Sequence, residues 1–134
     1  MFKILLVDDS KSAQLKILSI FSKYGKCDQA FNGQEGVDLF KASLEIDSAY
    51  DLIVMDIVMP KMDGFEAVKE IKRIQEKKNI PEEKRAKIIM LTSKADPDHL
   101  MKAHFEIGVT TYVTKPFEDK TLIEALSNLG LIEG

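Results

Sequence analysis

The sequence lacks the features typical of secreted, membrane-spanning and nucleic-acid-binding chains. It contains a single cysteine, Cys27, so an internal disulfide is excluded. No apolar run approaches the roughly 20 residues that span a bilayer, and the first residues lack the basic, apolar and small-residue order of a secretory signal. Nineteen Lys and Arg against 22 Asp and Glu give a net charge of -3, which does not favour nucleic acid or an anionic membrane as partner. We therefore expect a cytoplasmic protein whose partners are proteins or small ions.

The length and composition indicate one compact domain. A chain of 134 residues, 45% of them hydrophobic, can bury one sizeable core and is short for two. It shows no internal repeat or low-complexity segment. We expect a single domain over residues 1–134, monomeric and without an attached effector domain.

Short apolar runs predict a parallel sheet. Three of them, Ile4–Val7, Leu52–Met55 and Ile88–Leu91, are continuously apolar, and weaker candidates lie at 27–31 and 110–114. Continuous apolarity, in place of alternation, is typical of strands covered on both faces, which is the situation in a parallel sheet.

The segments between these runs show helical spacing of apolar residues. The five sets are Ala13, Ile17, Ile20, Phe21 and Tyr24; Val37, Phe40 and Leu44; Phe65, Ala67, Val68, Ile71 and Gln75; Leu100, Ala103 and Ile107; and Leu122, Ala125, Leu126 and Leu129. Strands alternating with helices form right-handed crossovers that place helices on both faces of the sheet. The sequence therefore predicts an α/β fold: a doubly wound, three-layer parallel sheet of five strands.

Five chemically complementary side chains follow or end the predicted strands. They are Asp8, Asp9, Asp56, Thr92 and Lys115. In an open parallel sheet, ligands bind outside the carboxyl ends of the strands. We therefore expect three acids, one hydroxyl and one amine to meet at one edge.

Each residue also has an ordinary structural interpretation. Asp9 or Ser10 could cap the following helix, Asp56 could begin a turn, Thr92 could be a cap, and Lys115 could be solvated. Three carboxylates together are harder to explain, because each unscreened pair at about 4 Å costs roughly 4 kcal/mol at an effective dielectric near 20. A hard divalent cation such as Mg2+ would offset that repulsion.

The remaining groups suggest phosphoryl chemistry. A carboxylate that attacks phosphorus needs in-line positioning and positive charge around the phosphoryl oxygens. Lys115 supplies charge and Thr92 a hydroxyl donor. On this hypothesis Asp56 is a phosphate acceptor.

Four motifs in this order resemble those of one family. They are "LLVDDS" at 5–10, "DIVMPKMDG" at 56–64, "MLTSK" at 90–94 and "YVTKPF" at 112–117. The chain resembles, over essentially its whole length, the receiver domain of two-component response regulators, most closely the stand-alone chemotaxis kind. The resemblance implies a flavodoxin-like (βα)5 fold with strand order 2-1-3-4-5.

The resemblance also implies roles for the acids. Asp56 would accept phosphate from a histidine kinase or a histidine phosphotransfer protein. Asp9, Asp56 and the backbone carbonyl of Val58 would bind Mg2+ (or Mn2+), and Asp8 would assist through water. The domain would not be a conventional enzyme but a phosphoacceptor that catalyses its own phosphorylation and dephosphorylation.

Further implied roles concern the switch and its output. Thr92 and Lys115 would contact the phosphoryl group, and the Lys115-Pro116 bond would be cis. Tyr112 would turn inward when Thr92 moves toward phosphate. Residues 96–129 would form the face that binds a downstream protein, as a population shift between two arrangements.

Some alternatives remain open at this point. Val58 and Lys94 depart from the residues often found at positions that tune phosphoryl lifetime in the family. An aspartate-nucleophile phosphatase would want a second acid where Val58 stands, and a non-phosphorylated interaction module would not need the complete set of site residues. A motility regulator, a phosphorelay intermediate and a phosphate sink are not distinguished by the sequence.

Overall fold

The computed structural model describes residues 2–60, 62–93, 108 and 111–133. The elements in chain order are β1 (Phe2–Val7), α1 (Lys11–Phe21), β2 (Gly25–Ala30), α2 (Gly33–Glu45), β3 (Leu52–Asp56), α3 (Gly64–Lys77), the short 3-10 helix η1 (Glu82–Lys84), β4 (Lys87–Ser93), β5 (Thr111–Lys115) and α5 (Asp119–Asn128). The helix expected around Leu100, Ala103 and Ile107 falls outside the described residues. Within the described part of the chain, no helix is long and apolar enough to cross a membrane.

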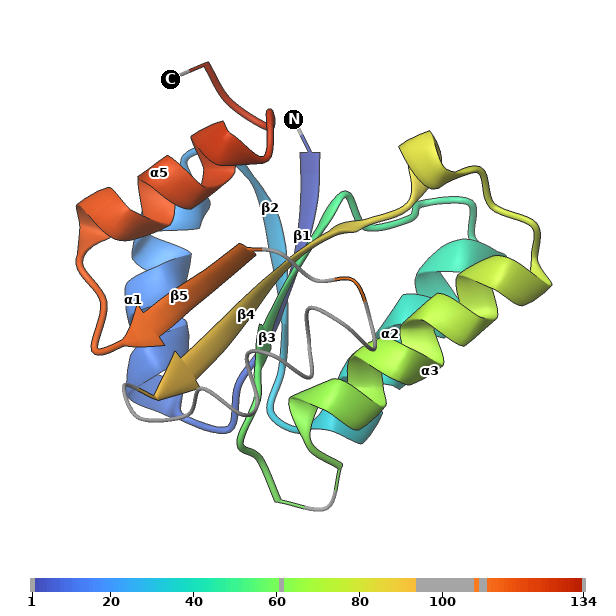
Figure 1. The fold of residues 1–134 in the computed structure, drawn as a ribbon, viewed down its shortest axis with the longest axis horizontal. Coiled ribbons are helices and arrows are strands. Elements are labelled where there is room, and N and C mark those ends of the chain that lie inside the picture. The colour runs from blue at the N-terminus through green and yellow to red at the C-terminus, as the bar shows by residue number, and fades with distance from the viewer. Residues whose placement is uncertain (1, 61, 94–107, 109–110, 134) are drawn as a thin grey trace.

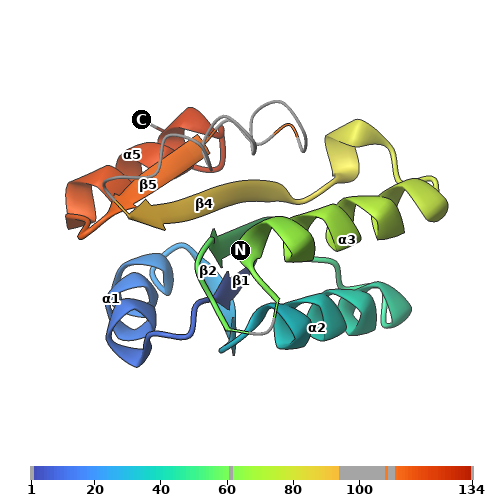
Figure 2. The same ribbon diagram turned by 60° about the horizontal axis from the view of Figure 1, so that its bottom comes forward.

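The five strands form one parallel sheet in the order β2-β1-β3-β4-β5. Helices α1 and α5 cover one face, and α2 and α3 cover the other (Figures 1 and 2). The predicted α/β fold, its three layers and the strand order are confirmed.

The central strands are buried on both faces, which explains their continuous apolarity. All five residues of β3 are buried. Leu52 and Val54 join the core beneath α1 and α5, whereas Ile53 and Met55 join the core beneath α2 and α3. This alternation follows from the two-residue period of a strand, and it decides on which side of the sheet each functional residue lies.

The edge strand β2 was harder to locate from the sequence. It covers Gly25–Ala30 instead of 27–31, and its burial is uneven because only one neighbour pairs with it. β3 and β5 each end one residue later than predicted, so Asp56 and Lys115 are the last residues of their strands.

Candidate functional site

Strand alternation places three of the predicted site residues on the same side of the sheet. Asp8, Asp56 and Lys115 each come two residues after an apolar residue of the core beneath α1 and α5: Leu6, Val54 and Val113. Asp8 lies just past β1, yet its N–H donates to the carbonyl of Ala30 at 3.1 Å, which extends the pairing with β2 by one residue. Its side chain therefore follows the alternation of the strand.

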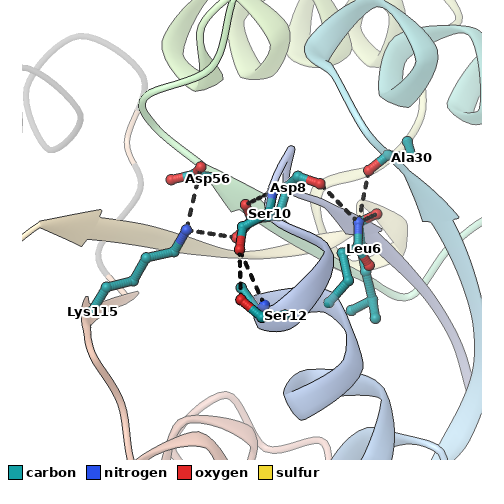
Figure 3. Close-up of polar contacts among 9 residues, drawn as sticks. Leu6, Asp8, Ser10, Ser12, Ala30, Asp56 and Lys115 are labelled. Atoms are coloured by element: carbon teal, nitrogen blue, oxygen red, sulfur yellow. Dashed lines mark hydrogen bonds and ion pairs between the residues drawn. The ribbon is translucent and has the colours of Figure 1, made fainter.

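The acids and the lysine meet at the carboxyl edge of the sheet. One carboxylate oxygen from each of Asp8, Asp9 and Asp56 lies within 4.8 Å of the others. Lys115 Nζ lies 2.7 Å from Asp8 Oδ2 and 3.4 Å from Asp56 Oδ2 (Figure 3). Asp8 and Asp56 are only 1% and 6% exposed, whereas Asp9 is exposed. Two buried carboxylates thus share one ammonium group, and a third borders them on the solvent side.

Burial and the neighbouring charges shift the pKa values of Asp56 and Lys115. Burial raises the pKa of Asp56 to about 7, and the neighbouring charge of Asp8 adds to this effect, while Lys115 opposes it. Burial alone would lower the pKa of Lys115, but its contacts with Asp8 and Asp56 outweigh burial and raise that pKa. The lysine therefore stays charged, and the carboxylate of Asp56 is destabilised in its ionised form.

The start of α1 fixes the roles of the residues in "DDS". Ser10 is the N-cap, because its Oγ accepts the Ala13 N–H at 3.2 Å. The Ser10 N–H in turn donates to Asp8 Oδ1 at 2.9 Å. Of the two residues that could have capped the helix, Ser10 does so, and the carboxylate of Asp9 stays beside the other two acids.

The turn after Asp56 depends on a close backbone approach at Gly64. A Cβ on Gly64 would lie 2.3 Å from the Asp56 carbonyl oxygen, and the Gly64 N–H donates to the Ile57 carbonyl at 2.8 Å. Asp63 caps α3 through a capping box with Glu66. The loop that follows Asp56 is thereby tied to the end of β3. The side chain of Val58 within it is 62% exposed.

Thr92 and Tyr112 belong to the side of the sheet covered by α2 and α3, and Thr92 lies near the end of β4, at the carboxyl edge of the sheet. Leu91 is the register partner of Asp56, and Thr92, one residue further, is 3% exposed. Tyr112 is half-buried, packs against the core beneath α2 and α3, and has a pKa raised by burial. Because Thr92 pairs with Thr114, two residues after Tyr112, both residues point to this face.

The other predicted positions are placed as follows. The Lys115-Pro116 bond is cis. Lys94 and most of the face between residues 96 and 110 lie outside the described residues.

Two residues that the sequence analysis missed hold the site from α1. Gln14 is buried, and its Nε2 donates to the carbonyls of Leu6, Asp8 and Ala30. Lys16 Nζ donates to the Phe117 carbonyl, two residues after Lys115, and lies 5.2 Å from the centre of the Phe117 ring. The spacing of Gln14 with Ile17 and Phe21 puts it on the buried face of α1, and a polar residue there is a signal that could have been noticed.

The donor set fits a hard divalent cation. Carboxylate oxygens are the ligands that Mg2+ and Mn2+ prefer, and one or two carboxylates with open positions suit Mg2+ in particular. Asp8 Oδ2 is buried and accepts no hydrogen bond from the described residues beyond its ion pair with Lys115.

The fold and the site define a class: a doubly wound parallel α/β domain with an acidic cluster of cation-binding type at the carboxyl edge. Residues 4–127 match the family described as the response regulator receiver domain, and the chain belongs to this family of two-component signalling domains.

The relatives include chemotaxis proteins. The chain is 37% identical over 128 residues to the chemotaxis protein CheY of Halobacterium salinarum, covering 95% of each. A hybrid signal transduction histidine kinase D of Dictyostelium discoideum is 35% identical over 94% of this chain, which spans 7% of that much longer protein.

Two solved structures are also similar. One is the receiver domain of Ssk1 from Saccharomyces cerevisiae with the histidine phosphotransfer protein Ypd1, with TM-score 0.81, 27% identity and coverage of 96% of this chain and 88% of that one. The other is the CheX-CheY-BeF3-Mg complex of Borrelia burgdorferi, with TM-score 0.76, 27% identity and coverage of 96% and 89%. The chain is thus a CheY-like receiver domain.

Proposed function

We propose that Asp56 is the phosphate acceptor of this receiver, phosphorylated by a histidine kinase or a histidine phosphotransfer protein. The observation that carries the proposal is the meeting of Asp8, Asp9 and Asp56 within 4.8 Å beside Lys115 Nζ. A structural role alone gives no reason to bury two like charges around one cation. A nucleophilic carboxylate held among groups that bind phosphoryl oxygens gives such a reason.

The neighbouring side chains would act on the incoming phosphoryl group. Lys115, held 3.4 Å from Asp56 Oδ2, moves its ammonium from carboxylate to phosphoryl oxygen as charge develops there. Thr92 contributes a hydroxyl from β4. Asp8 keeps Lys115 oriented through the 2.7 Å ion pair.

Mg2+ or Mn2+ would be held by the carboxylates of Asp9 and Asp56 and the backbone carbonyl of Val58, with Asp8 acting through water. When bound, the ion offsets the repulsion among the acids and supplies positive charge to the phosphoryl oxygens. The relative solved with BeF3 and Mg supports this cofactor.

The output would be a change in protein binding. Thr92 and Tyr112 share one face of the sheet, so movement of Thr92 toward the phosphoryl group opens space into which Tyr112 turns. The face built from residues 96–129 then shifts between two arrangements. The relatives solved with a histidine phosphotransfer protein and with CheX support protein partners. We propose a cytoplasmic, monomeric, single receiver domain over residues 1–134 that is no conventional enzyme, because its only substrate is its own Asp56.

Intact-mass analysis tests the acceptor directly. The parent protein, incubated with acetyl phosphate and Mg2+, is expected to gain the mass of one phosphoryl group, and the gain should disappear in Asp56→Asn and when EDTA replaces Mg2+. Asp51→Asn, which alters an exposed acid at the other end of β3, is the matched control and should gain mass like the parent. A gain that persists in Asp56→Asn would move the acceptor elsewhere. If the parent neither gains mass nor binds beryllium fluoride with Mg2+, the domain is a non-phosphorylated interaction module.

A further inference from the structure

Gln14 is a buried polar side chain at the junction of three backbone segments. It is 1% exposed. Its Nε2 lies 2.7 Å from the carbonyl oxygen of Ala30 and 3.2 Å from those of Leu6 and Asp8. Carbonyl oxygens only accept hydrogen bonds, so the nitrogen of the amide must face them. Gln29 Nε2 donates to Gln14 Oε1 at 3.2 Å, which supports the same orientation.

The contact with Asp8 matters because of the peptide that it holds. The Asp8 carbonyl belongs to the planar unit that joins Asp8 to Asp9, so fixing this oxygen fixes the direction in which Asp9 leaves. The Asp8 N–H is bound to Ala30, whose carbonyl also accepts from Gln14. Gln14 therefore acts on the peptide groups on both sides of the Asp8 side chain. Figure 3 shows Leu6, Asp8 and Ala30 together beside the acidic cluster.

We propose that Gln14 is a positioning residue for the cation site. It holds the Asp8-Asp9 peptide in the orientation that directs both carboxylates toward Asp56. The chain leaves the sheet just beyond β1, and the described contacts that restrain Asp8 are its N–H bond to Ala30, the Ser10 bond to its carboxylate, its ion pair with Lys115 and the Gln14 amide. The inference rests on the proposed function, in which the acids bind Mg2+.

The test is the replacement Gln14→Met, which keeps the length of the side chain and removes the donor. Loss of a group that orients metal ligands typically lowers metal affinity about 10- to 100-fold, and we expect a loss in this range. Gln75→Met on α3 is the matched control. Gln75 is also buried, at 3% exposed, and it lies near the end of α3, beside Leu44 and Tyr50 and away from the acidic cluster. It should bind Mg2+ like the parent.

Three readouts separate positioning from a general loss of stability. Calorimetric titration with Mg2+ gives the affinity of each variant. The Mg2+ concentration for half-maximal phosphorylation by acetyl phosphate should rise in Gln14→Met, while the rate at saturating Mg2+ returns close to the parent rate. In the metal-free protein, hydrogen exchange at the Asp8 amide should accelerate. If Gln14 had only a structural role, Gln14→Met would lower the melting temperature but would leave the Mg2+ concentration for half-maximal phosphorylation unchanged.

The outcomes are distinct. Equal Mg2+ affinity in the parent and in folded Gln14→Met overturns the positioning role and leaves the proposed function intact. Failure of the parent to bind Mg2+ refutes the proposed function itself, and the positioning role with it. If Gln14→Met does not fold, Gln29→Met takes its place, because it removes only the hydrogen bond to Gln14 Oε1. We expect Gln29→Met to weaken Mg2+ binding by a smaller factor, and unchanged binding in that variant overturns the inference.

Discussion

The two edges of the sheet treat their acidic residues in opposite ways. At the amino edge, the carboxylate of Asp51 accepts the Lys3 N–H at 2.8 Å, and the hydroxyl of Tyr50, just before β3, donates to Asp28 within β2 at 2.7 Å. Each acid has its own donor. At the carboxyl edge, the buried acids Asp8 and Asp56 share the single ammonium of Lys115 (Figure 3).

The acids of the first group, near the amino edge, are satisfied by contacts within the fold, whereas Asp8 and Asp56 share one cation and leave room for a ligand to add positive charge. Burial and the hydrogen bond to Asp28 raise the pKa of Tyr50, so the pair at that edge is stable as it stands. At the carboxyl edge, burial and then the neighbouring charge of Asp8 raise the pKa of Asp56 to about 7, and Lys115 offsets only part of this shift.

Removing the shared cation should have the largest effect. In Lys115→Met, Asp8 and Asp56 lose their common partner, and no ammonium remains for the developing phosphoryl charge. We expect the rate of phosphorylation by acetyl phosphate at saturating Mg2+ to fall about 10²- to 10³-fold, the range for loss of one preorganised donor. Lys120→Met is the control, because Lys120 is exposed on α5. A Lys115→Met rate within a few-fold of the control would show that the ammonium is not used.

The affinity for Mg2+ should depend on pH through Asp56. A ligand carboxylate must be ionised, and the raised pKa of about 7 means that Asp56 loses its proton only near neutral pH. Below that pH, calorimetric Mg2+ affinity should fall about tenfold per pH unit, and above it the affinity should level off. Asp56→Asn, which has no such proton, should bind Mg2+ more weakly but with a flatter pH profile. A flat profile in the parent between pH 5.5 and 8 would contradict the raised pKa.

Neutralising the acceptor should stabilise the metal-free protein. A carboxyl group with a raised folded pKa binds its proton more tightly in the native state than in the unfolded chain, where its pKa is 3.8. Its contribution to stability is therefore full at low pH and is lost as pH rises through about 7. We expect Asp56→Asn to raise the free energy of unfolding by about 1–3 kcal/mol at pH 8 in EDTA, and by less at pH 5.

Removing a hydrogen bond to an acid near the amino edge should lower the free energy of unfolding, the opposite of the effect expected for Asp56→Asn. Tyr50→Phe removes the donor to Asp28 and should lower the free energy of unfolding by about 1 kcal/mol at both pH values. Urea denaturation of the two variants and the parent measures both effects. If Asp56→Asn lowers the free energy of unfolding at pH 8, the ionised carboxylate of Asp56 does not destabilise the metal-free protein, and the proposed difference between the two edges is wrong.

The sequence allowed most of the fold, and the meeting of Asp8, Asp9, Asp56 and Lys115 at one edge of the sheet, to be predicted for a physical reason. Strands buried on both faces must be continuously apolar, so β1, β3 and β4 are visible as runs, and a parallel sheet brings their ends to one edge. The edge strand β2 was misplaced because its burial is partial. Its boundaries depend on pairing with β1, which no local pattern reports.

Other features depend on register or on distant backbone. That Thr92 and Tyr112 share a face follows from the pairing of β4 with β5, which the sequence does not specify. The role of Gln14 requires carbonyls from the ends of two strands, and that of Gly64 requires the Asp56 carbonyl to pass within contact distance. Such contacts are set by tertiary packing. The sequence pattern shows only that Gln14 is a polar residue on an apolar helix face and that Gly64 is a glycine at the start of a helix.

The smallest predicted effect concerns the lifetime of the phosphoryl group, and it tests the exposed rim of the carboxyl edge. Val58 follows the acceptor by two residues, and its side chain is 62% exposed. An apolar side chain there cannot hydrogen-bond a water that attacks the acyl phosphate, whereas an amide can. We expect Val58→Asn to speed the decay of phosphorylated protein several-fold, as followed by intact mass after removal of acetyl phosphate. Ile46→Asn is the matched control, because Ile46 is 71% exposed after α2, at the amino edge. Equal decay in both variants and the parent would show that water reaches Asp56 without help from position 58, and the lifetime would then be set by the buried groups of the site.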